Sequence, residues 1–266
     1  VREALKYEVD VLWIGARTTA NPFAVQEIAD SLSGLKIPVM VKNPVNPDVE
    51  LWIGAFERLN QAGIKTLAAV HRGCSSYIKT CYRNDPHWQI PIELKRRIPN
   101  LPIITDPSHI CGNREMLLET SQEAMDLDFN GLMIEVHHCP EAALSDRSQQ
   151  ITPDELKNIL SKLILRQADV GNALTSHTLD DYRSQIDKFD DKLLEILGKR
   201  MHVAEEIANY KKRNSITILQ SGRWDQLLTM RVNEGKIFGL SEDFVVKLFR
   251  TIHQESIDCQ IKIMHK

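Results

Sequence analysis

The sequence predicts an α/β region followed by an all-α region, and two patterns support this division. Up to about residue 165, short apolar runs alternate with amphipathic stretches of helical length, which is typical of a parallel sheet with crossover helices. After residue 178 the strand signal ends, and apolar residues recur at spacings of three and four, as on one face of a helix. We therefore expect an α/β domain over residues 1–165, a linker over 166–177 and a helical domain over 178–266.

Five apolar runs are expected to form strands. They cover residues 10–15, 37–41, 66–70, 101–105 and 131–136. Each run is short and apolar on both faces, as buried parallel strands are. Segments 49–62 and 113–126 lie between runs and are amphipathic over helical lengths, so they are expected to be crossover helices.

Each predicted strand is followed by a short segment whose polar side chains could bind a ligand or take part in catalysis. These segments are Ala16-Arg17-Thr18, Lys42-Asn43, His71-Arg72-Gly73, Asp106-Pro107-Ser108-His109 and Glu135-Val136-His137. Functional groups at the carboxyl ends of successive parallel strands are typical of a (β/α)8 barrel and also of open doubly wound sheets. A closed barrel has eight strand–helix units, so the five predicted here are expected to be its C-terminal part, with about three more before Val1.

The helical region is expected to hold three helices. The first, over residues 179–213, carries an apolar stripe along roughly 50 Å of helix, at about 1.5 Å per residue. Such a stripe is too long to be buried within so small a domain, so we expect a partner chain to cover part of it. The second helix is expected over 223–234 and the third over 241–263, with Ser241 as its N-cap.

Composition and charge exclude several classes of protein. The formal net charge of -3 argues against a nucleic-acid binder held by phosphate contacts. No run approaches the roughly 18 to 20 apolar residues of a membrane span, and no secretory signal opens the sequence. The five cysteines are odd in number and form no CxxC pair, which favours reduced thiols and a cytoplasmic location.

Six strand-end residues are candidates for a site in the α/β region. His109, Glu135 and Asp146 combine an imidazole with two carboxylates, a donor set that suits a divalent ion such as Mn, Fe, Co or Zn. Three cationic side chains follow earlier strands and would point into the same open end of the barrel. This arrangement favours an anionic, phosphorylated substrate. These cations are Arg17, Lys42 and Arg72. A single strand-end histidine is more often structural, but the whole set in register favours a functional site.

The α/β region resembles the type I 3-deoxy-7-phosphoheptulonate (DAHP) synthases, in the branch close to the octulosonate-phosphate synthases. The matching stretches are residues 14–18, 41–42, 71–73, 105–109, 134–137 and 144–146. The resemblance implies condensation of phosphoenolpyruvate with erythrose 4-phosphate. It makes His109, Glu135 and Asp146 metal ligands, and the three cations ligands of phosphoenolpyruvate. An octulosonate-phosphate synthase is the alternative interpretation of the α/β region.

This chain departs from the synthase pattern at two motifs. The family's Gly-Pro-Cys motif, which carries a fourth metal ligand, and its Lys-Pro-Arg segment are both absent from the sequence. Synthase activity is therefore expected only of a polypeptide with residues before Val1.

The helical region places its polar residues on shared faces. Arg200 and Lys211 are three helical turns apart, and Ser256 and Gln260 are four residues apart, so each pair shares a face. Arg183 falls on another face of the first helix. Any one of these residues alone is more often a solvated surface residue.

Together they resemble the all-helical AroQ class of chorismate mutases. The match extends over nearly 90 residues, through Arg183, Asp190, Arg200, Lys211, Arg223, Ser256 and Gln260. The resemblance implies that Arg200 and an Arg183 from the other protomer of a dimer bind the carboxylates of chorismate. It places Lys211 on a carboxylate and the ether oxygen, and Gln260 on the ether oxygen. It puts Ser256 near a carboxylate and Arg223 beside the ring hydroxyl.

Two positions near the ring hydroxyl depart from the common mutase pattern. Where the family often has an acid before Arg223, this chain has Gln220, which can still hydrogen-bond. Where it often has Glu after Arg223, this chain has Trp224, whose indole offers only a donor. These departures support an alternative, in which the helical domain is a non-catalytic module that binds prephenate or chorismate and dimerises. An isochorismate pyruvate lyase on the same scaffold is a third reading.

The two resemblances together imply a bifunctional shikimate-pathway enzyme. The mutase would require no cofactor, and the barrel would require the divalent metal. The chain is expected to form a homodimer through the helical domain, and a tetramer through the barrels is a further option. We also expect allosteric feedback, in which prephenate or chorismate held by Arg183, Arg200 and Lys211 inhibits the barrel.

Overall fold

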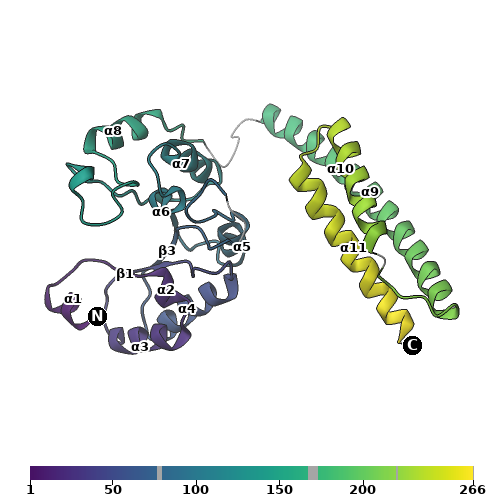
Figure 1. Cartoon of the computed structure of the whole chain (residues 1–266). Coiled ribbons are helices and arrows are strands. Elements are labelled where there is room, and N and C mark those ends of the chain that lie inside the picture. The colour runs from purple at the N-terminus through teal and green to yellow at the C-terminus, as the bar shows by residue number, and fades with distance from the viewer. Residues whose placement is uncertain (77–79, 167–172, 220, 266) are drawn as a thin grey trace. The chain divides into compact units, whose positions relative to one another are not determined.

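The computed structural model describes residues 1–76, 80–166, 173–219 and 221–265. The chain divides into two compact units, Val1–Asp169 and Val170–Lys266 (Figure 1). We call them the sheet unit and the helical unit. The predicted α/β and all-α classes are both confirmed.

Five parallel strands form the sheet of the first unit. They are β1 (Leu12–Ile14), β2 (Val39–Lys42), β3 (Leu67–His71), β4 (Ile103–Thr105) and β5 (Gly131–Leu132). Their order across the sheet is β1-β2-β3-β4-β5, and every neighbouring pair is parallel. A doubly wound sheet reverses its strand order at a switch point. Because this sheet shows no reversal, it has the winding of part of a (β/α)8 barrel.

Helices connect and cover these strands. They are α1 (Arg2–Lys6), α2 (Ala16–Thr19), α3 (Pro22–Leu32), α4 (Val49–Gln61), α5 (Gln89–Arg97), α6 (Pro107–Cys111), α7 (Leu117–Asp126), the 3-10 helix η1 (Pro140–Ala142) and α8 (Pro153–Lys162). The segment predicted as a helix over 113–126 begins only at Leu117, because the Asn113 side chain accepts hydrogen bonds from Glu115 and Met116 and forms a turn there.

The apolar core of the sheet unit lies between the strands and their helices. Its largest fully buried side chain is Trp52 of α4, whose indole N–H donates to the Val41 carbonyl at 3.1 Å. Leu59 and Ile103 are also fully buried in this core. The core fixes the strands, and so it fixes the positions of the side chains that follow them.

The fifth strand is shorter than predicted. Only Gly131 and Leu132 pair with β4 as a strand, although 131–136 was expected to be extended sheet. Beyond them the chain pairs instead with Ile151, which donates to the Glu135 carbonyl at 3.1 Å and accepts from the His137 N–H at 2.8 Å. Glu135 lies beside the residues that follow β4, where its N–H donates to the Ser108 hydroxyl at 2.9 Å.

The helical unit holds α9 (Ala173–Arg213), α10 (Ser221–Ile237) and α11 (Glu242–Met264). The predicted linker over 166–177 is partly wrong, because α9 already includes residues 173–177, while residues 167–172 lie outside the described residues. The Ser241 side chain caps α11 as predicted and accepts from the Phe244 N–H at 3.3 Å. No helix in the described ranges combines the length and apolarity of a membrane span.

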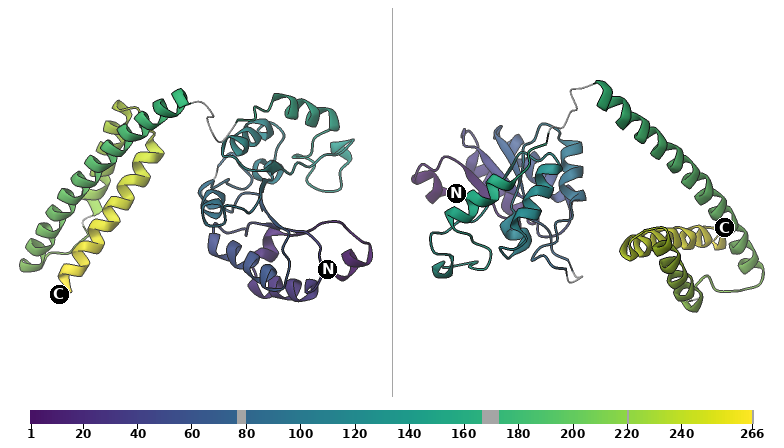
Figure 2. Two further views of the ribbon diagram at one scale, coloured as in Figure 1. Left: turned by 180° about the vertical axis from the view of Figure 1, so that it is seen from behind. Right: turned by 90° about the horizontal axis from the view of Figure 1, so that it is seen from above.

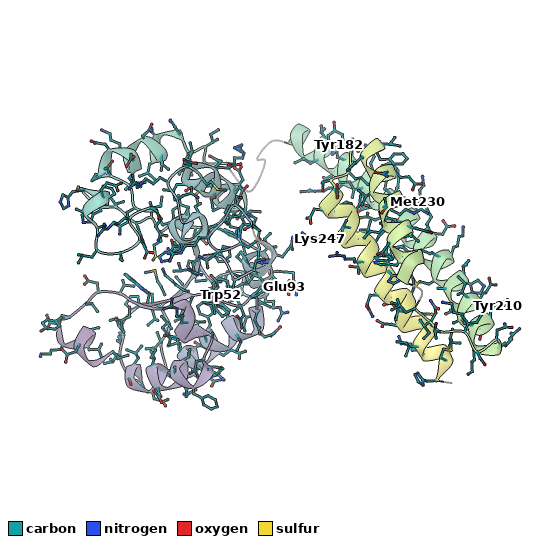
Figure 3. All side chains as sticks on the ribbon, viewed as in Figure 1. Trp52, Glu93, Tyr182, Tyr210, Met230 and Lys247 are labelled. Carbon is teal, nitrogen blue, oxygen red and sulfur yellow. The ribbon has the colours of Figure 1, made fainter. Side chains whose placement is uncertain are left out.

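The N-terminal half of α9 is exposed. Every residue from 177 to 196 is exposed, and Figure 2, seen from above, shows this half running away from α10 and α11. Tyr182 lies in this half, whereas Tyr210 lies near the other end of α9 (Figure 3). The described residues of α9 that are buried, Ala204 and Ala208, lie in its C-terminal half, and the cavity of this unit lies there too.

Two candidate functional sites

A cavity of about 560 Å³ opens at the carboxyl ends of the strands of the sheet unit. We call it the strand-end cavity. Arg17 in α2, Lys42 at the end of β2 and Arg72 after β3 all line it, together with His109 and Asp146. The structure therefore brings together five of the six predicted strand-end residues around one space. Burial lowers the pKa of Arg72, and the charges of Arg83 and Arg17 act in the same direction, while Asp106 opposes them. This excess of positive charge in the lining of the strand-end cavity favours the binding of an anion there.

The sixth residue, Glu135, completes a group of possible metal ligands. One ligand atom each from His109, Glu135 and Asp146 lies within 4.8 Å of the other two, and all three residues are half-buried. Asp146 reaches this position with a φ of 48°, in the left-handed region that Asp tolerates better than most residues. Ligand atoms about 2.1 Å from one ion lie at most about 4.2 Å apart, so a small closure of the side chains suffices. The donor set and the spacing fit a divalent ion.

Asp106 orients the histidine of this group. Its carboxylate accepts from Nδ1 of His109 at 2.9 Å and from Nζ of Lys42 at 2.8 Å. Burial would raise the pKa of Asp106, but its hydrogen bonds and the charges of His109 and Lys42 bring it below the usual value. With Nδ1 engaged, Nε2 of His109 remains for a metal, the arrangement common in histidine ligands.

Arg83 and Gln149 are two further polar residues that support the site, and sequence reasoning missed their roles. Arg83 donates from Nη1 to Asp146 and to Gln149, both at 2.6 Å. The buried Gln149 donates from Nε2 to Glu135 at 3.0 Å. The hydrogen bond from Arg83 is the main reason that the pKa of Asp146 is lowered.

Asn84 joins the two halves of the cavity. Its Oδ1 accepts from Nη1 of Arg72 at 2.5 Å, and its Nδ2 donates to the His109 carbonyl at 2.6 Å. The Asn84 side chain thus fixes the guanidinium of Arg72, a candidate anion ligand, and the backbone of His109, a candidate metal ligand.

The helical unit has its own cavity, of about 460 Å³. We call it the helical cavity. Its polar lining comes from Arg200 and Lys211 of α9, Trp224 of α10, and His253, Ser256 and Gln260 of α11. The remaining lining is aliphatic, so these polar groups converge in a largely apolar space.

Five of the predicted mutase residues line this cavity, and within the described ranges four of them, all except Trp224, make hydrogen bonds there. Arg200 donates to the Ser256 hydroxyl at 2.5 Å, and Lys211 donates to the Ile218 carbonyl at 2.6 Å. Gln260 donates to the Ser256 carbonyl at 3.2 Å, while its buried Oε1 has no hydrogen-bond partner among the described residues. Burial lowers the pKa of Arg200, and the charge of Arg231 adds to this effect.

The other predicted residues differ in their placement. Arg183 does not line the helical cavity of its own chain, because it lies in the exposed half of α9, where it pairs with Asp180 at 3.0 Å. Trp224 lines the cavity. Gln220 lies outside the described residues, and Arg223 lies in α10 with its side chain outside them.

His253 is a cavity residue that sequence reasoning missed. A signal was present, since His253 precedes Ser256 by three residues and Gln260 by seven on the same helix. Those spacings place a residue on the face that carries the predicted site.

The comparisons with known proteins divide the chain at the same place. The family model for the DAHP synthetase I family matches residues 2–170, and the model for chorismate mutase type II matches residues 182–261. A phospho-2-dehydro-3-deoxyheptonate aldolase from Thermotoga maritima is 29% identical over 154 residues, which cover 58% of this chain and 44% of that protein. A bifunctional chorismate mutase/prephenate dehydratase from Buchnera aphidicola is 30% identical over 92 residues, 35% of this chain and 24% of that protein.

A solved structure agrees with the family of the sheet unit. A truncated form of 3-deoxy-D-arabino-heptulosonate 7-phosphate synthase from Thermotoga maritima aligns with a TM-score of 0.54 and 27% identity, over 60% of this chain and 59% of that chain. The chain spans less than half of the two curated relatives named above. The chain belongs to the DAHP synthetase I family, and it carries a chorismate mutase type II domain behind the synthase region.

Proposed function

We propose that the helical unit rearranges chorismate to prephenate. The observation that carries this proposal is the convergence of two cations, Arg200 and Lys211, with Ser256 and Gln260 in one cavity. Chorismate is a small dicarboxylate, and its rearrangement is intramolecular, so it requires no nucleophile and no proton transfer. An enzyme accelerates such a reaction by holding the reactive conformer and stabilising charge that develops on the breaking ether bond.

The cavity residues match these tasks. The Arg200 guanidinium and the Lys211 ammonium would leave their present partners, Ser256 and the Ile218 carbonyl, for the substrate carboxylates, since charged hydrogen bonds are stronger. The amide of Gln260 lines the cavity with its Oε1 unpaired among the described residues. A half-turn of that amide, which gives up the Nε2 bond to the Ser256 carbonyl, would present an N–H to the ether oxygen. The half-burial of Arg200 strengthens its attraction for a carboxylate.

A second copy of the chain would complete this site. Apolar side chains at positions 179, 182, 186, 189, 193 and 196 are all exposed and follow alternating spacings of three and four. Such spacing forms one seam along a helix, and seams of this kind pair with another helix. Arg183 lies in the same segment, outside the cavity of its own chain. We therefore propose a homodimer in which Arg183 of each chain serves the cavity of the other.

The direct test is the conversion of chorismate by the full chain, followed by the loss of its absorbance. Arg200→Ala should lower kcat/KM at least about a hundredfold, because it removes a charged hydrogen-bond donor from the carboxylate site. Lys199→Ala is the matched control, since Lys199 is exposed and pairs with Glu195. If the wild-type chain binds prephenate by calorimetry but converts no chorismate, the helical unit is the non-catalytic binding module instead.

A second activity is favoured by the strand-end cavity. We propose that the sheet unit supplies the phosphoenolpyruvate and metal-binding part of a DAHP synthase site. The supporting observation is that Arg17, Lys42 and Arg72 line one cavity beside the His109–Glu135–Asp146 group. A bound divalent ion of the Mn, Fe, Co or Zn class would polarise the carbonyl of the aldehyde substrate. Arg72, held by Asn84, would orient the phosphoenolpyruvate anion.

Binding measurements test this second proposal on the chain itself. Phosphoenolpyruvate should bind in the presence of Mn²⁺, and Arg72→Ala should weaken it at least about tenfold. Arg58→Ala is the control, because Arg58 lies on α4 outside the strand-end cavity and donates to Gly54. Equal affinity in wild type and Arg72→Ala would count against the assignment. In a polypeptide that turns over, a comparison of erythrose 4-phosphate with arabinose 5-phosphate separates a DAHP synthase from an octulosonate-phosphate synthase.

A further inference from the structure

His253 lines the helical cavity without a role in the rearrangement described above. It lies on α11 on the same face as Ser256 and Gln260. Its side chain is half-buried, and within the described ranges neither ring nitrogen makes a hydrogen bond. A half-buried imidazole with two unused nitrogens, facing a cavity, is free to bind a ligand there.

Trp224 holds this imidazole in place. The two ring centroids lie 4.0 Å apart with an angle of 28° between the planes, so the rings are stacked. Trp224 belongs to α10 and His253 to α11, so the stack joins two helices in one cavity wall. Stacking covers a face of the imidazole and leaves its edge, with both nitrogens, accessible.

The surroundings of His253 favour the neutral form of its imidazole. Burial lowers the pKa of His253, and the nearby charge of Arg200 lowers it further. A neutral imidazole has one N–H donor and one lone-pair acceptor. A hydroxyl group has the same combination, whereas a carboxylate only accepts and is better served by Arg200 or Lys211.

The groups of the substrate can now be assigned in turn, on the basis of the proposed mutase function. The carboxylates fall to Arg200 and Lys211, and the ether oxygen to Gln260. The ring hydroxyl then remains, and among the described cavity residues His253 is the polar side chain with unused donor and acceptor capacity. We infer that His253 hydrogen-bonds the ring hydroxyl of chorismate and that Trp224 is the positioning residue that orients the imidazole.

The test compares two substrates, chorismate and 4-deoxychorismate, which lacks the ring hydroxyl. The wild-type chain should prefer chorismate in kcat/KM by about tenfold, the value of one neutral hydrogen bond at the upper end of its range. His253→Phe keeps a flat ring against Trp224 but has no nitrogens, so the preference should fall to about one. His253→Gln, which keeps a donor and an acceptor, should restore part of it.

Trp224 is tested by the same ratio. Trp224→Phe keeps an aromatic face and should retain the preference, whereas Trp224→Ala should reduce it toward one. His202→Phe on α9 is the matched control, because His202 lies outside the helical cavity with its side chain 72% exposed. It should leave the preference unchanged.

The inference is overturned if His253→Phe keeps the tenfold preference. That includes the case in which the variant slows both substrates equally, as loss of packing alone would do. Failure of the mutase proposal looks different, since the wild-type chain would then convert neither compound. Calorimetric binding of the two compounds to wild type and His253→Phe would still test the hydroxyl contact, with the same tenfold difference expected in Kd.

Discussion

The stability of the sheet unit should fall in mild acid because of one buried histidine. His71 ends β3 and is fully buried between Trp52 and Trp88, whose ring centroids lie 6.4 Å and 5.3 Å from its own. Burial lowers the pKa of His71 to about 3, and the charge of Arg72 contributes in the same direction. The perturbation is a change of pH from 7 to 4.5, in wild type and in His71→Phe.

The sign and size of the change in the free energy of unfolding follow from the pKa of His71 in the unfolded chain and in the folded chain. In the unfolded chain a histidine titrates near 6.5, whereas folded His71 titrates at about 3. Below pH 6.5 the unfolded chain binds a proton that the folded chain excludes, so stability is lost as the pH falls toward 3. The loss is about 1.4 kcal/mol per pH unit in this window, or roughly 2.7 kcal/mol at pH 4.5.

The measurement is urea unfolding followed by tryptophan fluorescence at both pH values. Carboxylates also contribute to acid sensitivity, so the informative quantity is the difference between proteins. His71→Phe should lose about 2.7 kcal/mol less than wild type between pH 7 and 4.5. His138→Phe, at an exposed histidine of the same unit, should behave as wild type. An equal loss in wild type and His71→Phe would refute the reasoning.

Three other predictions concern the two cavities and a helix cap. Arg183→Ala and Arg200→Ala should each abolish mutase activity with little loss of stability, and an equal mixture should recover about a quarter of wild-type turnover, because half of the dimers are hybrids with one intact site; no recovery would argue against a shared site. Gln149→Leu should weaken Mn²⁺ binding at least about tenfold by electron paramagnetic resonance, because Glu135 loses its donor, whereas Gln150→Leu should not. Thr152→Ala should cost about 1 kcal/mol in urea unfolding, because it removes the capping box of α8.

The fold was largely predictable because its signals are periodic. Buried parallel strands and amphipathic helices repeat along the chain, so most strands and the last two helices could be placed within a few residues, whereas α9 begins six residues before its predicted start. The second half of the fifth run could not be placed, because its partner, Ile151, is fixed by tertiary pairing rather than by local pattern.

The sites were predictable where residues follow strands or share a helix face. Strand ends converge by topology, and for that reason Arg17, Lys42 and Arg72 could be expected in one mouth. Arg83, Asn84 and Gln149 lie in irregular segments, where spacing carries no information about neighbours. Helix spacing placed His253 on the face of Ser256 and Gln260, but its stacking partner, Trp224, lies in a different helix, and spacing within one helix does not reveal such a partner.

The exposed seam of α9 has a consequence for the stability of the helical unit, which should depend on protein concentration. The six large apolar side chains of this seam, which begins at position 179 and ends at 196, face water in the single chain. Burying each would contribute about 1.5 to 3 kcal/mol, so whatever covers them supplies a large share of this unit's stability. When the covering surface is another protomer, the midpoint of thermal unfolding rises with protein concentration, and dilution loosens the helices. The mutase activity per chain would then rise with protein concentration, because the shared site forms only in the dimer.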